Sequence, residues 1–341
     1  MSGRALRWLL SLLPRPARDS TPILVILRHH RVFGAGERPL YRIGVSEGLL
    51  RAQLDTLARL GAAPVTISEG LARLAGGAPG RTVALSFDDG YADNVRRALP
   101  LLAAAGARAT FFLTAGLIEE RRAPWWDELA YLLASTREGR LEYQGRRLGL
   151  AHDEDRARAL RALLPAFRAT PAAQRSLLAE LAGKLRVREP APCVLATWEE
   201  CGALREAGME VGAHTLTHPF LSTLPAAEQA VEIGGSFDLI ESRLGVRPRG
   251  FAYPGGDHDT ASVSATRAAG AAWAVTTRAG ENRTGTPVFE LLRRGLSEGA
   301  CLGPGGRFSE RLTLAELEGR FERLRARRER AGGSAGTEVA G

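Results

Sequence analysis

Short apolar runs alternate with segments of helical periodicity along most of this chain. Residues 22–28, 82–87 and 108–114 are rich in β-branched and other apolar side chains, as in buried strands. Between the first two runs, leucines recur at helical spacing over 46–60, and Gly61 follows as a helix stop signal. This alternation predicts an α/β protein with a parallel sheet.

The alternation resumes in the second half of the chain. Thr197 and Glu200 have the spacing of a capping box and predict a helix that ends near residue 207. Further helices are predicted over 93–105, 225–244, 260–269 and 313–329, and further strands over 209–213, 249–253, 272–277 and 291–297. The number of alternating units favours a barrel-like α/β domain over separate modules.

Between about residues 120 and 190 the regular alternation is interrupted. This stretch begins with a Pro-Trp-Trp-Asp sequence at 124–127 and a short helix. A hairpin is predicted over 141–150 around Gly145, followed by two helices rich in Arg, Ala and Leu at about 154–168 and 171–186. We interpret the stretch as a mostly helical insertion in the main fold.

The charge of the chain does not by itself predict a partner. Of 341 residues, 46 are basic and 38 acidic, which gives a net charge of +8, and 45% are hydrophobic, which excludes a disordered chain. Lys184 is the only lysine, so the positive charge comes from arginines scattered along the sequence. Because they do not cluster, a nucleic-acid partner is not expected.

The cysteines and the N-terminus indicate where the protein is located. Cys193, Cys201 and Cys301 are odd in number and show no C-x-x-C spacing, so neither a disulfide framework nor a thiolate zinc site is predicted. The N-terminal run Trp8–Leu13 is too short for a signal peptide, and we expect an amphipathic helix that contacts a membrane surface peripherally. No window approaches the roughly 20 apolar residues of a spanning helix. A cytoplasmic location is predicted.

Three groups of chemically capable residues follow predicted strands directly. Asp88 and Asp89 come after 82–87, His214 and His218 come after 209–213, and a Tyr-Pro-Gly-Gly sequence ends the strand at 249–253. Since the carboxyl ends of parallel strands meet at one edge of an α/β fold, we expect these groups to lie together.

Each group has a functional and an ordinary interpretation. Adjacent carboxylates after a buried strand need a metal, a cation or water, or else form a solvated Asp-Gly turn. His214 and His218 are spaced to share one face of a helical turn and, with a carboxylate from Asp88 or Asp89, to form a metal site open to substrate; otherwise they are unrelated surface histidines. The Pro-Gly-Gly sequence lets backbone approach a ligand closely or is a simple turn.

Together the motifs resemble those of the polysaccharide deacetylase family, also called the NodB-homology carbohydrate esterases. Ser86–Gly90 matches the motif [TS]-F-D-D-G, and His214–His218 matches H-[ST]-x-x-H. Phe251–Gly256 stands where the family has F-R-x-P-Y-G. Arg28–Val32 resembles the Y-H-R-V segment of one branch, which also has a Trp-Trp-Asp insertion, so the resemblance covers about residues 22–300.

The resemblance implies a fold and a domain division. The expected fold is a distorted (β/α) barrel of the NodB-homology type with the insertion at about 120–190. The catalytic domain would span 22–312, after an N-terminal segment at 1–21. A C-terminal helix and a disordered tail would occupy 313–341.

The resemblance also implies roles for individual residues. Asp89, His214 and His218 would bind a divalent metal, expected to be Zn²⁺, although Ni²⁺ or Co²⁺ would also suit these ligands. Asp88 would act as general base. Tyr253, Pro254 and Gly255 would bind substrate, with the Gly255 backbone N–H facing the oxyanion.

The chain departs from the family pattern at two points. The third-motif arginine that holds the base is replaced by Ala252, and Arg294, next to Arg293, is expected to take its place. The late leucine–histidine motif that supplies the general acid has no match after residue 259, so His258 or His30 is expected to serve.

The implied activity is removal of N-acetyl groups from sugars of a polysaccharide or glycan precursor, so a carbohydrate is the expected partner. Two alternatives remain open at this point. One is a deformylase or another amidohydrolase acting on a non-polymeric amide. The other is a non-catalytic relative that binds an anionic ligand.

Overall fold

Seven parallel strands form the central sheet of the protein. They are β1 (Ile23–His29), β4 (Arg81–Phe87), β5 (Ala109–Leu113), β8 (Glu210–Ala213), β9 (Gly250–Ala252), β10 (Trp273–Val275) and β11 (Arg294–Gly295). This computed structural model describes residues 7–8, 11–12 and 20–321. The spatial order is β10-β9-β8-β5-β4-β1-β11. From β1 to β10 the neighbours follow the order of the chain, and the last strand, β11, pairs with the other side of β1. Val275 of β10 forms a bridge with Leu291, just before β11, although β10 and β11 are at opposite ends of this order. The sheet is therefore curled, which confirms the predicted distorted (β/α) barrel.

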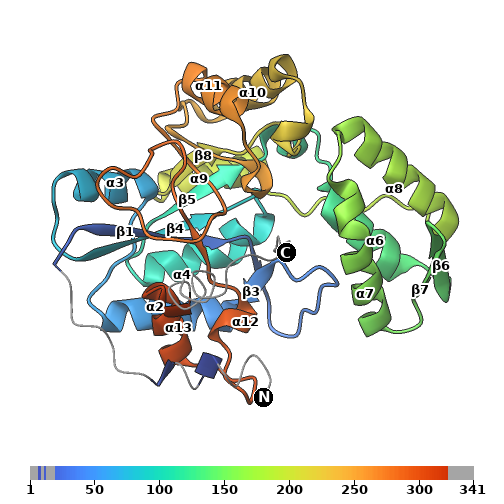
Figure 1. Cartoon of the computed structure of the whole chain (residues 1–341), viewed down its shortest axis with the longest axis horizontal. Helices are drawn as coiled ribbons and strands as arrows, with labels where there is room; N and C mark the ends of the chain where they lie inside the picture. The colour runs from blue at the N-terminus through green and yellow to red at the C-terminus, as the bar shows by residue number, and fades with distance from the viewer. Residues whose placement is uncertain (1–6, 9–10, 13–19, 322–341) are drawn as a thin grey trace, which may run out of the picture.

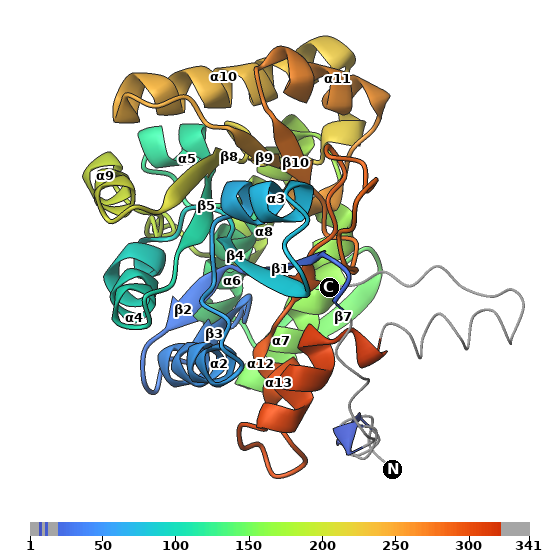
Figure 2. The same cartoon turned by 90° about the vertical axis from the view of Figure 1, so that its left-hand side faces the viewer.

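Helices surround this curled sheet (Figures 1 and 2). They are α2 (Glu47–Arg59), α3 (Ile67–Ala75), α4 (Leu99–Ala104), α5 (Ala115–Glu119), α9 (Trp198–Glu206), α10 (Ala226–Leu244), α11 (Thr260–Ala268), α12 (Glu298–Cys301) and α13 (Glu310–Leu317). Helices α10 and α11 pack together at the top of both views, whereas α2 and α13 pack together at the opposite end. A pair of short parallel strands, β2 (Arg31–Phe33) and β3 (Gly44–Ser46), contacts α2.

Apolar side chains of the strands and helices form the core. In β1 the side chains of Ile23 to Leu27 are all buried, which explains the continuous apolar run in the sequence. Ser46 caps α2 by accepting a hydrogen bond from the backbone N–H of Leu49, and the leucines of this helix face the core. Local capping and burial therefore act in the same direction, as the leucine periodicity predicts.

The interruption at about 120–190 forms a lobe beside the barrel, drawn in green at the right of Figure 1. It contains α6 (Trp125–Ser135), the hairpin β6 (Arg140–Tyr143) and β7 (Arg146–Gly149), α7 (Asp153–Leu163), the 3₁₀ turn η2 (Leu164–Phe167) and α8 (Pro171–Leu185). Gln144 and Gly145 both have positive φ, as a tight hairpin turn requires. The lobe has its own hydrophobic cluster, which includes Leu133, Leu160 and Leu181.

Some predicted elements differ from those observed. The helix predicted over 93–105 begins with a π-helical turn, η1 (Asn94–Ala98), because Pro100 lacks the N–H of a regular helix. The strand predicted over 291–297 is only the two residues of β11, and α3 was not predicted although Thr66 and Glu69 form a capping box.

The predictions for the two ends of the chain are only partly covered. The C-terminal helix predicted over 313–329 is observed as α13, but it ends at Leu317, because a turn at 318–319 with Gly319 at a φ of 63° interrupts it. The predicted residues from 322 onward, including the tail, lie outside the described residues. Most of the N-terminal segment also lies outside them, so its membrane contact stays a prediction. Within the described part of the chain, no helix has the length and apolar character needed to cross a bilayer. The three cysteines are free thiols.

Candidate active site

Asp88 and Asp89 lie in a tight turn at the carboxyl end of β4. The Asp88 N–H donates to the carbonyl oxygen of His29 at 3.0 Å, which ties this turn to the end of β1. Asp89 (φ 74°) and Gly90 (φ 81°) both occupy the left-handed region. Such backbone costs free energy for an aspartate, and residues of this kind cluster at functional sites.

Asp89 points at two histidines of the loop after β8. Its Oδ1 lies 3.4 Å from His214 Nε2 and 3.5 Å from His218 Nε2. One ligand atom from each of the three residues lies within 4.8 Å of the others. All three side chains are largely buried, so the predicted metal ligands are brought together in one place.

The loop that carries both histidines is not helical, in contrast to the helical turn inferred from their spacing. Thr215 (φ 65°) and His218 (φ 60°) are left-handed and turn the chain back on itself. Glu232 of α10 holds this turn, because its Oε2 accepts the backbone N–H groups of Leu216 and Thr217, each at 2.9 Å. Glu232 was not predicted, because it lies 14 positions after His218, outside the motif (232 − 218 = 14).

The donor atoms of this cluster fit a divalent metal ion. His214 Nδ1 lies 2.6 Å from the carbonyl oxygen of Ala252, to which it donates, leaving Nε2 free as a ligand. Asp89 Oδ2 and His218 Nδ1 are buried without a hydrogen-bond partner in the described structure. Burial and the neighbouring His214 lower the pKa of His218 to about 3, so its imidazole is neutral, as a metal ligand must be. Two histidines and one carboxylate leave coordination positions open.

Asp88 is held by Arg293 instead of by the predicted Arg294. The Arg293 guanidinium donates to both carboxylate oxygens of Asp88, at 2.6 and 2.8 Å, and is itself fully buried. Its Nε donates to the carbonyl oxygen of Thr276 at 2.9 Å, which fixes the fork. Burial alone would raise the pKa of Asp88, but the Arg293 charge outweighs it and holds that pKa well below its usual range.

Arg294 lies elsewhere because neighbouring side chains point to opposite sides of extended backbone. Its Nη1 donates to the carbonyl oxygen of Leu317 at 2.7 Å, and its Nη2 lies 3.4 Å from Glu281. Arg293 therefore has the contact with Asp88 that was expected of Arg294, so the predicted residue was wrong by one position.

His30 and His258, the two histidines predicted as general acid, occupy different surroundings. His30 Nε2 lies 3.9 Å from Asp88 Oδ2, and burial lowers the pKa of His30 to about 4. His258 Nδ1 lies 2.9 Å from the carbonyl oxygen of Gly256, and its ring stacks on Tyr253 with centroids 4.8 Å apart. Of the two, only His30 is therefore placed beside the carboxylate pair.

The residues predicted to bind substrate differ in exposure. The Tyr253 side chain is fully buried in the core, and Pro254 is buried beside it, so neither presents surface to a substrate in this conformation. Gly255 is exposed and has a φ of 60°, in a 3₁₀ turn at the end of β9. Of the three, Gly255 alone offers an accessible backbone group.

Arg28 is a charged neighbour for which no role was predicted from the sequence, although it begins the segment that resembles Y-H-R-V. It lies in β1, is largely buried, and interacts electrostatically with Asp88, Asp89 and Arg293. Burial and then the Arg293 charge lower the pKa of its guanidinium. The apolar pattern did not indicate that Arg28 is near the aspartates, because an arginine at the end of an apolar strand is usually exposed to solvent.

The insertion contributes directly to the walls of the cluster. Trp126 packs edge-on against His218, with ring centroids 4.3 Å apart, and its Nε1 donates to the Tyr91 hydroxyl at 2.7 Å. That hydroxyl donates in turn to Asp127 Oδ2 at 2.8 Å. The Trp-Trp-Asp sequence therefore links the lobe both to a metal-ligand candidate and to the turn after β4.

Asp127 gives a testable pH dependence of stability. Burial raises the pKa of this carboxyl to about 6, with the Tyr91 hydrogen bond opposing part of that effect. Because the folded state disfavours the ionised form, stability falls as the pH rises from about 4 through 6. Asp127→Asn has no charge to bury and still accepts from Tyr91. We expect its melting temperature, relative to the unmodified protein, to be higher at pH 7.5 than at pH 4.5. An equal difference at both pH values would show that this ionisation is not linked to folding.

Comparison with known proteins identifies the family of the chain. The fold is similar to that of Streptococcus pyogenes deacetylase PplD in complex with acetate, at 18% identity and a TM-score of 0.57, covering 84% of this chain and 97% of that one. It is also similar to IcaB from Ammonifex degensii (23% identity, TM-score 0.50, covering 81% and 91%) and to the BpsB deacetylase domain from Bordetella bronchiseptica (16%, 0.52, covering 83% and 98%). No curated protein sequence gives a significant match. The sequence profile of the polysaccharide deacetylase family matches residues 75–274, so the chain belongs to this family.

Proposed function

We propose that the protein is a divalent-metal-dependent hydrolase that removes N-acetyl groups from sugar residues of a glycan. The observation that carries this proposal is the buried Asp88–Arg293 pair beside the cluster of Asp89, His214 and His218. One carboxylate is engaged by a cation, and the other faces the histidines. This division gives two adjacent aspartates two different roles.

Asp88 is proposed as the general base. Its negative charge is maintained by Arg293, and the bidentate fork fixes the plane of its carboxylate. A fixed carboxylate can accept the proton of a water molecule that attacks the amide carbon. Arg293 acts through Asp88 and is therefore a positioning residue.

Asp89, His214 and His218 are proposed to hold the ion. Bound there, a divalent ion supplies Lewis-acid chemistry, because it lowers the pKa of water and polarises a carbonyl. Its identity is proposed to be Zn²⁺, which favours nitrogen and carboxylate ligands. The exposed Gly255 N–H is the proposed donor to the oxygen that becomes negatively charged.

His30 is proposed as the general acid that protonates the leaving amine. It adjoins Asp88, and its side chain is 19% exposed, so a substrate can reach it. Because burial lowers the pKa of His30 to about 4, its imidazole is neutral at rest, and it would act as an acid after receiving the proton that Asp88 takes from water. His258 is less well placed, because its contacts are with Gly256, Tyr253 and Glu290.

Metal removal tests the function. We expect chelation of the purified protein to abolish acetate release from N-acetylated oligosaccharides, and Zn²⁺, Ni²⁺ or Co²⁺ to restore it. His214→Ala should bind less than stoichiometric metal by elemental analysis and lose activity by at least about 100-fold. Formate and acetate are measured in parallel, since formate release would favour the deformylase alternative. Undiminished acetate release after chelation, and from folded His214→Ala, would refute the proposal.

A further inference from the structure

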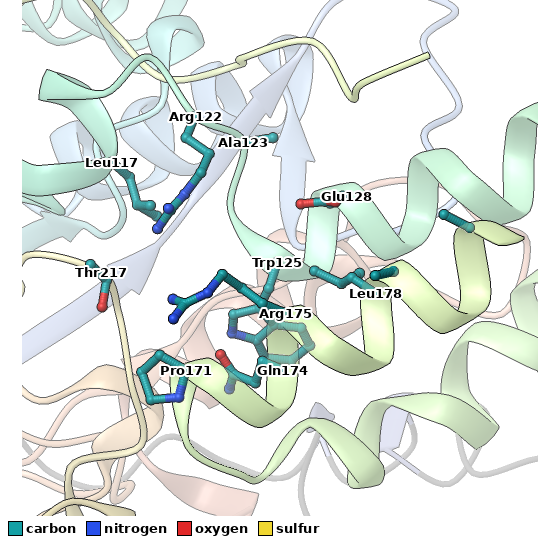
Figure 3. Close-up of a pocket in the computed structure, with 12 residues that line it drawn as sticks. Leu117, Arg122, Ala123, Trp125, Glu128, Pro171, Gln174, Arg175, Leu178 and Thr217 are labelled. Carbon is teal, nitrogen blue, oxygen red and sulfur yellow. The ribbon is translucent and has the colours of Figure 1, made fainter. Parts of the chain in front are cut away.

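A pocket of about 330 Å³ lies between the insertion lobe and the loop that carries the two histidines (Figure 3). This volume is at the lower end of the range of roughly 300–1,000 Å³ found for small-molecule sites. Its polar lining includes Arg122, Glu128, Gln174, Arg175 and Thr217. The apolar lining includes Leu117, Trp125 and Leu178.

The pocket adjoins the candidate active site through two pairs of neighbouring residues. Thr217 lines the pocket and directly precedes His218. Trp125 lines it as well and directly precedes Trp126, whose ring contacts His218. A ligand chain that occupies the pocket is therefore close to the cluster.

Two arginines from different elements give the pocket its charge. Arg122 follows α5 and Arg175 lies in the second turn of α8, and Figure 3 shows both guanidinium groups pointing into the pocket. Arg122 also pairs with Glu120 at 3.0 Å, but that pair is exposed and so contributes little. Among the described residues, no carboxylate pairs with Arg175. Glu128 also lines the pocket and interacts with the Arg122 charge, so one positive charge remains in excess among these three side chains. A negatively charged group between the two guanidinium groups would therefore be stabilised.

The remaining walls suit a sugar ring. Trp125 is held by stacking on Phe167, with ring centroids 4.9 Å apart and planes 3° apart. Its buried Nε1 has no acceptor within the described structure and could donate to a hydroxyl or ring oxygen. Apolar surface together with a few fixed polar groups is the usual composition of a ligand site.

We propose that this pocket binds an acidic sugar unit of the glycan, next to the N-acetylated unit that is hydrolysed. The proposal rests on the proposed function, because it assigns a neighbouring unit of the same substrate. It names an acidic glycan as the substrate class. Arg122 and Arg175 are the residues that distinguish this glycan from a neutral one.

The test compares two N-acetylated tetrasaccharides, one acidic and one neutral. A hyaluronan tetrasaccharide carries carboxylates, whereas chitotetraose is neutral. Binding is measured by calorimetry and acetate release in parallel, for the full chain and for R122Q, R175Q and the double variant. The control is R161Q. Arg161 is an exposed residue of α7 in the same lobe and does not line the pocket.

We expect the unmodified protein and R161Q to bind the acidic tetrasaccharide more tightly than chitotetraose. Loss of one charged contact should weaken acidic binding about tenfold. The double variant should bind the two sugars equally. Equal binding by the unmodified protein, or an unchanged preference in the double variant, overturns the proposal.

Two further results separate related explanations. If inorganic phosphate binds as tightly as the acidic tetrasaccharide with the same dependence on both arginines, the pocket is a small-anion site and the proposal is wrong. If the acidic sugar binds through the arginines while no acetate is released from either sugar, the pocket assignment stands and the proposed function fails. The two hypotheses therefore fail on different measurements.

Discussion

Asp88→Asn is expected to reduce kcat by a factor of about 10²–10⁴, the range contributed by a positioned general base. The amide keeps the shape of the carboxylate but cannot accept a proton from water. KM should change little, because Asp88 is engaged by Arg293 and not by a binding surface. Steady-state acetate release measures both parameters.

The same substitution has a second expected effect, on stability. Arg293 is fully buried, and its Nη1 lies 2.6 Å from Asp88 Oδ1. The substitution removes the negative charge of this ion pair. Breaking a buried pair in this way costs about 3–5 kcal/mol. Chemical denaturation at a temperature where the variant stays folded separates this loss from the catalytic one. Full activity in folded Asp88→Asn would exclude Asp88 as the base.

Arg293→Lys should lower kcat strongly even though the charge is preserved. A lysine ammonium cannot form the two parallel bonds that now hold both oxygens of Asp88, nor also donate to the Thr276 carbonyl. The carboxylate plane is then no longer fixed, and a displacement of about 1 Å can cost 10²-fold in rate. Acetate release over a range of substrate concentrations should show the loss mainly in kcat.

Arg294→Lys is the matched control for this experiment. Arg294 is the next residue, is also buried, and bonds to Leu317 and Glu281 instead of to Asp88. Its substitution should affect the melting temperature but leave kcat within about twofold, as expected for a residue away from the reacting groups. If Arg294→Lys lost activity and Arg293→Lys did not, the pairing with Asp88 would not be the functional one.

The barrel and its candidate cluster were largely predictable from the sequence. Buried parallel strands appear as continuous apolar runs, and the polar residues that follow them meet at one edge whatever the exact strand limits. Asp89, His214 and His218 each follow such a run, and the structure brings them together. A motif at the end of a strand is therefore robust to errors in the boundaries of elements.

Arg293, the partner of Asp88, was harder to predict because it directly precedes a strand of only two residues. β11 has only two paired residues, so no alternating pattern marks which of Arg293 and Arg294 faces the interior. A slip of one residue exchanges the two sides of a strand. The choice depends on tertiary contacts of Arg293 with Thr276 and Asp88, which no local pattern contains.

The histidine loop illustrates a second limit. A spacing of four residues is compatible with a helix, but Glu232 of α10 binds the loop backbone and stabilises a different turn. Side-chain contacts of this kind join segments that are distant in sequence. The candidate metal ligands could be predicted from the sequence, whereas the backbone conformation of the loop that carries the two histidines could not.

The contact of Trp126 with His218 and Tyr91 has a consequence for protein engineering. Grafting the lobe of a relative onto this barrel to change substrate preference would replace part of the wall around the candidate metal cluster. A functional chimera must transfer Trp126, Asp127 and Tyr91 as one unit, although Tyr91 belongs to the barrel. The boundary for such an exchange therefore lies in the side-chain contacts and not at the two points where the lobe leaves the chain.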